Sequence, residues 1–185
     1  MRTERLTLRA WTAEDRALFA EMNADPVVME HFPATLTRDE SDAFVDRIEA
    51  GFEARGFGLW VVDVDGSGFA GFTGLAVPRF RVAWMTGRPE PPVEVGWRLR
   101  RDAWGHGFAT EAARAALAFG FDGVGLEEIV SFTVVGNLRS QAVMRRLGMT
   151  RLAFYDHPVE DRDPLPSVAY VLGAADWRHG PRPSR

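Results

Sequence analysis

Two glycines that flank a histidine, Gly105 and Gly107, stand between an apolar run at residues 93–99 and a segment rich in small residues. Residues without a Cβ atom allow several backbone N–H groups to point at one spot. The helix expected after them adds unpaired N–H groups and the positive end of its dipole. A turn of this kind binds anions and suits a pyrophosphate. The sequence therefore predicts a phosphate-bearing cofactor at residues 105–109.

Two other nucleotide-binding folds also use a glycine turn. The chain contains no Gly-Lys-Ser/Thr, so a phosphate loop with a lysine is excluded. A dinucleotide-binding fold is a stronger rival, since Glu127 lies at the distance expected for a ribose contact. Against it, three strand-like runs precede the turn and two of them form a hairpin, whereas a doubly wound sheet alternates strands and helices.

The elements that must position the turn follow from hydrophobic periodicity. Strands are expected at residues 4–11, 58–64, 69–75, 93–99, 128–134, 151–154 and 167–172. Helices are expected at about 13–22, after the capping box Thr37-x-x-Glu40, at 108–121, and from the turn at 136–138 through Arg146. Gly148 would end the last helix. The turn at 65–68 joins the second and third strands as a hairpin.

Two segments lack this periodicity. Residues 78–92 form a long connection that we expect to be a mobile loop. Its Phe80, Trp84 and Met85 either cover the mouth of a substrate site or pack onto the domain surface. Residues 177–185 are expected to be a frayed tail.

Composition narrows the class of protein. The chain has 185 residues, 46% of them hydrophobic and 26% charged, which is typical of one soluble globular domain. A net charge of −4 gives no basic field for nucleic acid. The absence of cysteine excludes disulfides, thiolate metal sites and a cysteine nucleophile. No signal-peptide or membrane-spanning pattern occurs, so a cytoplasmic protein without a membrane partner is expected.

A second motif follows the strand at 128–134, namely Asn137-x-x-Ser140 and the ending Leu147-Gly148-Met149. Together with the turn at 104–109 it resembles the GNAT superfamily of acyl-CoA-dependent N-acetyltransferases. The turn matches the signature Gln/Arg-x-x-Gly-x-Gly/Ala, with Trp104 in place of the usual first residue. The segments 4–11 and 104–113 most resemble the branch that contains ribosomal-protein N-terminal acetyltransferases. The resemblance spans nearly the whole chain and is weakest at 78–92 and after Pro158.

The resemblance implies one α/β (α+β) domain over residues 1–185. Its mixed, mostly antiparallel sheet would be flanked by helices and splayed between the strands at 93–99 and 128–134, with the pantetheine arm of acetyl-CoA in the gap. The implied cofactor contacts are Gly96, Trp97, Arg101, Trp104, Gly105, His106, Gly107, Phe108, Ala109, Thr110, Asn137, Arg139 and Ser140. No metal is implied. Arg100 and His31 are expected on the surface or in loops.

Acetyl transfer to an amine needs a base, an oxyanion contact and a proton for the leaving thiolate. Glu94 is the expected base, acting through a water, and its alternative is a polar residue on a half-exposed strand. A backbone N–H near Gly96 or Trp97 would contact the oxyanion. Many family members use a tyrosine as the general acid at the position where this chain has Met144. Ser140 or a water would therefore supply the proton.

Several assignments have alternatives. Ser140 can instead make a helix N-terminal contact beside Asn137, and Asn137 can form an Asx turn rather than contact pantetheine. Asp156 and His157 are second candidates for substrate binding or proton transfer.

The implied reaction is acetyl-CoA-dependent acetylation of a primary amine by direct attack in a ternary complex. A CoA-binding sensor without catalysis and a nucleotide-dependent oxidoreductase are the alternatives. The acceptor would be a protein N-terminus or a small-molecule amine, with a homodimer as a family-level expectation. Acidic residues at 78–92 and 159–163 either attract a cationic acceptor or are merely solvated.

Overall fold

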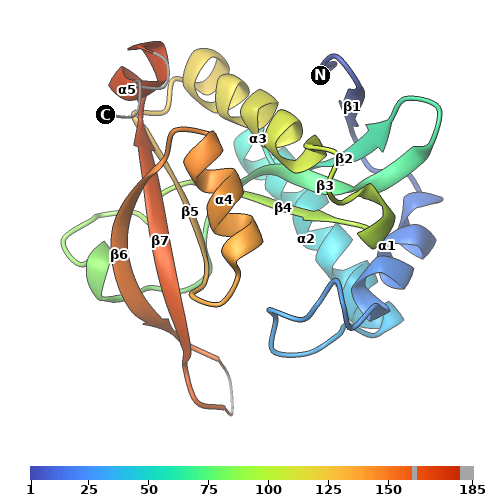
Figure 1. Cartoon of the computed structure of the whole chain (residues 1–185), viewed down its shortest axis with the longest axis horizontal. Coiled ribbons are helices and arrows are strands. Elements are labelled where there is room, and N and C mark those ends of the chain that lie inside the picture. Colours follow the sequence, from blue (N-terminus) through green and yellow to red (C-terminus); the bar gives the residue numbers. More distant parts are fainter. Residues whose placement is uncertain (160–161, 180–185) are drawn as a thin grey trace.

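The computed structural model describes residues 1–159 and 162–179. In them a seven-stranded sheet has the order β1-β2-β3-β4-β5-β7-β6 (Figure 1). The strands are β1 Leu6–Arg9, β2 Leu59–Val64, β3 Gly68–Ala76, β4 Glu94–Leu99, β5 Glu128–Val134, β6 Thr150–His157 and β7 Leu165–Gly173. The α-helices are α1 Asp15–Ala24, α2 Arg38–Arg55, α3 Phe108–Ala118, α4 Leu138–Arg146 and α5 Ala174–His179. This arrangement confirms the expected α/β domain with a mixed, mostly antiparallel sheet.

The sheet divides where β4 meets β5. These two strands run parallel, and their ladder holds one Cα pair, Glu94 with Val130. The N–H of Val130 donates to the carbonyl of Val93 at 2.9 Å. All other described neighbours in the sheet pair antiparallel over at least four residues. The expected splay between the strands at 93–99 and 128–134 is therefore present.

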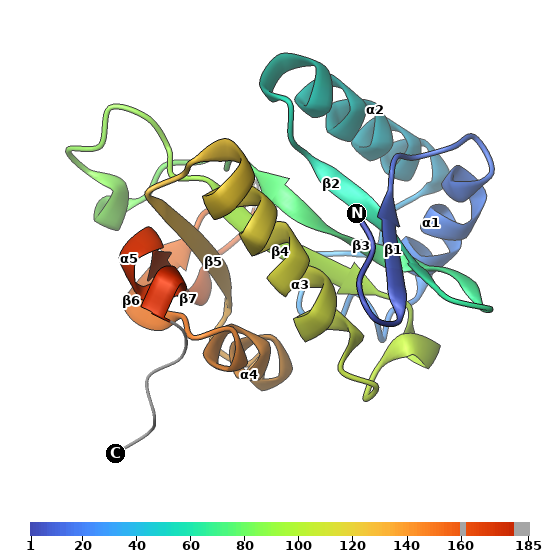
Figure 2. The ribbon, with the colours of Figure 1, turned by 90° about the horizontal axis from the view of Figure 1, so that it is seen from above.

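Helices cover both faces of the sheet (Figure 2). On one face, Phe19 of α1 and Val45 of α2 pack against Val61 and Phe72. On the other face, Ala113 and Ala116 of α3 pack beside Leu75, Val95 and Ile129. Small side chains let α3 approach the sheet closely. None of the helices in the described residues is both long and apolar enough to cross a membrane.

Local signals explain where the helices begin and end. Thr37 and Glu40 form the expected reciprocal capping box at the start of α2, whose end is marked by Gly56 with φ of 74°. Before α1, the Asp15 carboxylate accepts from the backbone N–H and hydroxyl of Thr12, at 2.7 and 3.0 Å, and the helix begins at Asp15 rather than at 13.

Three elements extend beyond the residues expected from the sequence. α3 continues into a π-helical turn, Phe119–Val124, beyond the expected end at 121. β6 and β7 are longer than the expected strands at 151–154 and 167–172.

At the C-terminus the described residues correct part of the expected tail. Residues 177–179 belong to α5, where Trp177 stacks on Phe121 with ring centroids 5.5 Å apart. Its indole N–H lies 3.3 Å from both carboxylate oxygens of Asp122. The rest of the expected tail, residues 180–185, and residues 160–161 of the acidic segment lie outside the described residues.

The connection 78–92 packs against β5 and β6. It contains a short 3-10 helix, Ala83–Met85, in which Met85 is fully buried. The Phe80 ring contacts Phe132 and His157, with centroids 5.1 and 4.4 Å apart. Arg88 forms an ion pair with Glu128 at the start of β5. The connection 78–92 therefore packs through its aromatic side chain Phe80 against the sheet. That this loop is mobile stays a prediction.

Candidate active site

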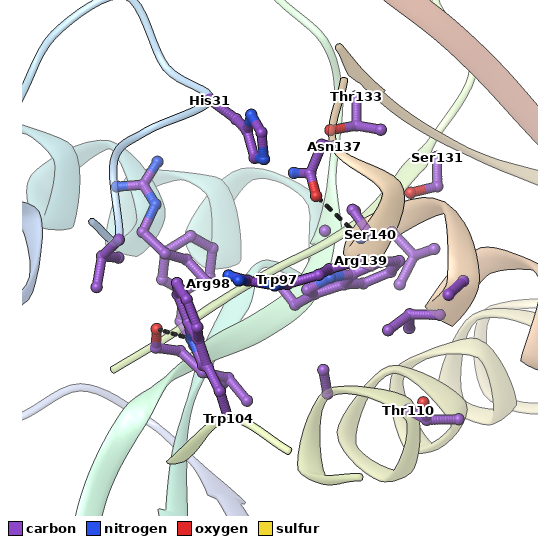
Figure 3. Close-up of a pocket in the computed structure, with 18 of the residues that line it drawn as sticks. His31, Trp97, Arg98, Trp104, Thr110, Ser131, Thr133, Asn137, Arg139 and Ser140 are labelled. Carbon is purple, nitrogen blue, oxygen red and sulfur yellow. Dashed lines mark hydrogen bonds between the residues drawn. The ribbon is translucent and has the colours of Figure 1, made fainter. Parts of the chain in front are cut away.

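A cavity of about 1580 Å³ opens where β4 and β5 diverge (Figure 3). It is bordered by β4, β5, the turn before α3, the start of α4 and the segment between α1 and α2. The lining includes the expected base Glu94 and all but one of the implied cofactor contacts: Gly96, Trp97, Trp104, Gly105, His106, Gly107, Phe108, Ala109, Thr110, Asn137, Arg139 and Ser140. The fold brings together residues that lie more than 40 positions apart in the sequence.

Arg101 is the exception. It lies in a short 3-10 helix, Arg101–Ala103, is exposed, and borders a separate shallow groove beside Leu18 and Met22. Arg101 does not line the main cavity, so its expected phosphate contact is not supported. Arg100 pairs with Asp102 at 3.1 Å, in keeping with its expected surface position.

The glycine turn has the geometry of an anion site. Gly105 and Gly107 have φ of 81° and 83°, a region that other residues adopt only with strain. In the described residues, no acceptor takes the N–H groups of residues 105–109, whereas those of Thr110 and Glu111 both reach the carbonyl of Gly107. The free N–H groups line the cavity at the start of α3, where the helix dipole favours negative charge.

An ion pair that sequence reasoning missed holds this turn in place. Arg5 contacts Glu111 with Nη2 2.6 Å from Oε2, and its Nη1 donates to the carbonyl of His106 at 3.0 Å. Glu111 also accepts from the hydroxyl of Thr3 at 2.6 Å. The residues are more than 100 positions apart, so only their charges could have suggested the pairing.

Backbone groups of β4 and β5 face the gap. Because the carbonyl of Val93 is directed at β5, the alternation of a strand directs the polar groups of Trp97 the same way. By the same rule those of Phe132 point back from β5. Gly96 faces β3 instead, and its carbonyl accepts from Thr73 at 3.0 Å. Of the two expected oxyanion contacts, the geometry favours Trp97.

Glu94 is recessed in the cavity wall, with protein atoms around its carboxyl group. Burial raises its pKa from 4.5 to about 8. No ion pair or hydrogen bond to its side chain is present in the described residues. A carboxyl group that titrates near neutral pH can accept a proton from an amine or a water.

Tyr155 and His157 lie on the same wall, which they reach from β6. The hydroxyl of Tyr155 is buried and has no hydrogen-bond partner of good geometry among the described residues, and the hydroxyl of Ser167 donates to the carbonyl of Leu165 at 2.8 Å. Burial, with a smaller effect of Glu94, raises the pKa of Tyr155, and burial lowers that of His157. Strand alternation turns Asp156 to the other face of β6, where it is exposed and does not line the cavity, and its part in substrate binding stays a prediction. Tyr155 was missed, although the same alternation around Asp156 marks it.

The start of α4 forms the wall opposite α3. Asn137 Oδ1 accepts from the N–H of Ser140 at 3.0 Å, so Asn137 caps α4, and Ser140 makes the helix N-terminal contact that was its alternative role (Figure 3). The hydroxyl of Ser140 makes no hydrogen bond within the described residues and lines the cavity. Met144 is fully buried in the core and does not line the cavity.

Arg139 spans the opening of the cavity. Its Cζ lies 4.8 Å from the centroid of the Trp104 ring, and its Nη1 lies 3.4 Å from Glu30 in the segment after α1. The indole N–H of Trp104 donates to the carbonyl of Leu99 at 2.9 Å. Arg139 is 71% exposed and can turn toward a phosphate. His31, also expected at the surface, lies 3.5 Å from Glu30 and contributes to the cavity wall.

A splayed mixed sheet with a free-amide turn beside the gap is the arrangement expected for a protein that binds an acyl-CoA co-substrate. Residues 5–150 match the family described as an acetyltransferase (GNAT) domain. The chain therefore belongs to the GNAT acetyltransferase family, and is an N-acetyltransferase that uses acetyl-CoA.

Individual relatives agree with this family. The chain is 30% identical to FsC-acetyl coenzyme A-N(2)-transacetylase of Aspergillus fumigatus, over all of this chain and 80% of that protein. Spermidine N-acetyltransferase of Vibrio cholerae, solved with CoA and spermine, shares the fold at 15% identity, with a TM-score of 0.73 over 95% of this chain and 99% of that one. RimL, a ribosomal-protein alpha-N acetyltransferase solved with coenzyme A, has a TM-score of 0.72 at 16% identity, over 94% and 97% of the two chains.

Proposed function

We propose that this protein moves the acetyl group of acetyl-CoA to a primary amine by direct attack in a ternary complex. The observation that carries the proposal is the position of Glu94, a proton acceptor recessed in the same cavity as the β4–β5 gap and the free-amide turn. The turn at 105–109 would hold the pyrophosphate, and Trp97 and Phe132 would contact the pantetheine arm. Acetyl-CoA supplies the thioester when bound.

The amine nitrogen forms a bond to the thioester carbon and gives a tetrahedral oxyanion, and the carbon–sulfur bond breaks as this intermediate collapses and releases the thiolate of CoA. The N–H of Trp97 stabilises the oxyanion of the tetrahedral intermediate. The amine proton passes to Glu94, directly or through a water, and the thiolate takes a proton from Ser140 or a water. The hydroxyl of Tyr155, which lines the same cavity as Glu94 and has no hydrogen bond in the described residues, would position that water.

Isothermal titration with acetyl-CoA tests the cofactor half of the proposal. Binding that NADH does not reproduce, and that Gly107→Glu removes, is the expected result. A screen of protein N-termini and small amines then tests transfer, with release of free thiol as the readout. A folded protein that fails to bind acetyl-CoA would contradict the proposal.

A sensor without catalysis is the second candidate, since the buried Met144 leaves α4 without the usual acid. This candidate predicts acetyl-CoA binding with no transfer to any amine in the same screen. Turnover that Glu94→Gln abolishes would exclude it.

A further inference from the structure

An arginine is buried beside the proposed reaction site. Alternation along β4 places the side chains of Glu94 and Arg98 on one face, with Gly96 between them, and all three residues line the cavity. The Cα atoms of Glu94 and Arg98 are about 13 Å apart, from the rise of 3.3 Å per strand residue. A Cβ atom added at Gly96 would meet nothing within 4 Å, so the floor between the two side chains is open.

Arg98 is 9% exposed, and its neighbours are mostly aromatic. Its Cζ lies 4.1 Å from the Phe32 ring centroid and 5.5 Å from that of Phe72. Nη1 donates to Asn23 Oδ1 at 2.6 Å, and Asn23 in turn donates to Ser41 at 3.1 Å. Figure 3 shows Arg98 near the segment that carries His31.

The guanidinium has more donors than partners. Neither Nε, which is buried, nor Nη2 donates a hydrogen bond within the described residues. No carboxylate in the described part of the chain forms an ion pair with Arg98, although buried arginines are normally paired with one. Burial lowers the pKa of Arg98 to about 10, which still leaves the group charged at neutral pH.

The carboxylates of Glu30 and Glu94, which also line the cavity, do not neutralise the charge of Arg98. Glu30, on the segment between α1 and α2, is engaged by Arg139 at 3.4 Å and lies 3.5 Å from His31. Glu94 stands at the far end of the same face of β4. Nη2 of Arg98, which has no hydrogen bond in the described residues and is not among the buried unpartnered atoms, therefore stays available for an anion, and a guanidinium is well suited to bind a carboxylate.

We propose that Arg98 binds a carboxylate of the acceptor, so that the preferred acceptors are amines that also carry a carboxylate group. The inference rests on the proposed function, because Glu94 must receive the amine at the other end of Gly96. The aromatic rings around Arg98 exclude water and strengthen the contact. The resulting subsite selects amino carboxylates over simple amines and polyamines.

Titration calorimetry of the enzyme saturated with CoA tests the subsite without any turnover. The probes are glycine, β-alanine, γ-aminobutyrate and L-leucine, each compared with its carboxamide. At least one carboxylate is expected to bind about 10- to 100-fold more tightly than its carboxamide. Arg98→Met, which fills similar space without charge, is expected to erase that difference while the affinity for acetyl-CoA stays unchanged.

Asn23→Asp gives an independent variant. It places a carboxylate where Asn23 Oδ1 now contacts Arg98. The resulting internal ion pair is expected to neutralise the guanidinium and so weaken binding of the acceptor carboxylate. A circular-dichroism melt confirms that each variant is folded. Should Arg98→Met fail to fold, Asn23→Asp alone decides the question.

Equal binding of carboxylates and carboxamides would overturn the inference. So would a preference that survives in Arg98→Met, or a loss of acetyl-CoA affinity, which would assign Arg98 to a cofactor phosphate. Acetylation assays separate the two proposals. Selective carboxylate binding without transfer upholds the subsite and contradicts the proposed function, whereas transfer without selectivity does the reverse.

Discussion

Arg5 and Glu111 join the first residues of the chain to the first turn of α3, with Nη2 2.6 Å from Oε2. The same guanidinium holds the carbonyl of His106, in the middle of the glycine turn, at 3.0 Å. The shape of the anion site therefore depends on a segment that precedes β1. An anion-binding turn needs such support, because its N–H groups must point inward before the ligand arrives.

Loss of this support should weaken cofactor binding. Glu111→Ala removes the partner of Arg5 and the acceptor of Thr3, and we expect a destabilisation of about 1–2 kcal/mol with a several-fold higher Kd for acetyl-CoA. Chemical denaturation and calorimetry measure the two effects. Asp65→Ala is the matched control, since it breaks the exposed contact with Arg2 at 3.4 Å and should change neither. An unchanged Kd in Glu111→Ala would contradict this support.

Substitution of the turn glycine should abolish cofactor binding without unfolding the protein. Gly107→Glu puts a carboxylate where the N–H groups expect a phosphate, and we expect the Kd for acetyl-CoA to rise at least about 100-fold by charge repulsion and lost space. Gly66→Glu is the control, because Gly66 has a matching φ of 81° in the β2–β3 turn. Equal binding by both variants would disprove the assignment of the turn.

The activity should depend on the ionisation of Glu94. With its pKa raised to about 8, only the deprotonated fraction acts as a base, so kcat/KM should increase with pH up to about 8 and then level off. Glu94→Gln should lower kcat about 100-fold or more and remove this dependence. A pH profile that keeps its shape in Glu94→Gln would assign the base elsewhere.

The same carboxyl group should make stability depend on pH. The folded protein binds the Glu94 proton more tightly than the unfolded chain, in which the pKa is near 4.5. Stability should therefore fall as pH rises from about 4.5 through about 8, and this contribution is fully lost only above that range. Melting of wild type and Glu94→Gln across the range measures the difference, which should grow in favour of Glu94→Gln. Parallel curves would contradict the raised pKa.

Tyr155→Phe separates a positioning role from a structural one. The hydroxyl is buried without a partner, so its removal should leave stability unchanged or slightly higher. We expect kcat to fall about tenfold while the Kd for acetyl-CoA stays constant, because the water beside Glu94 loses a contact. Thr150→Val, on the same strand and exposed, is the control. An unchanged kcat would leave Tyr155 without a part in the reaction.

Most of the fold could be predicted because it depends on local signals. Periodicity placed β5 at its observed bounds, and the Thr37–Glu40 box placed the start of α2. The outer ends were less predictable, since Trp177 extends the ordered chain through a contact with Phe121 on a distant turn. Of the site, the glycine turn and Asn137 were readable from the spacing of small and capping residues.

Contacts made by the three-dimensional fold could not be read in the same way. Arg101 is close to the glycine turn in sequence, yet it is exposed in a 3-10 helix and borders a separate groove. Arg5 and Arg98 look like ordinary surface charges in the sequence. Only the packing of α3 on β1, and of α1 and α2 on β4, reveals their partners.

The single rung between β4 and β5 has a consequence for local opening. The amides of Trp97 and Phe132 face the gap, so in the free protein they should exchange their hydrogens for deuterium quickly, whereas amides in the β5–β7 ladder are paired. A pantetheine arm in the gap would act as the missing strand and protect both edges. The two halves of the sheet would then open as one cooperative unit rather than two. The concentration of acetyl-CoA would therefore govern how often the β4–β5 gap opens to solvent.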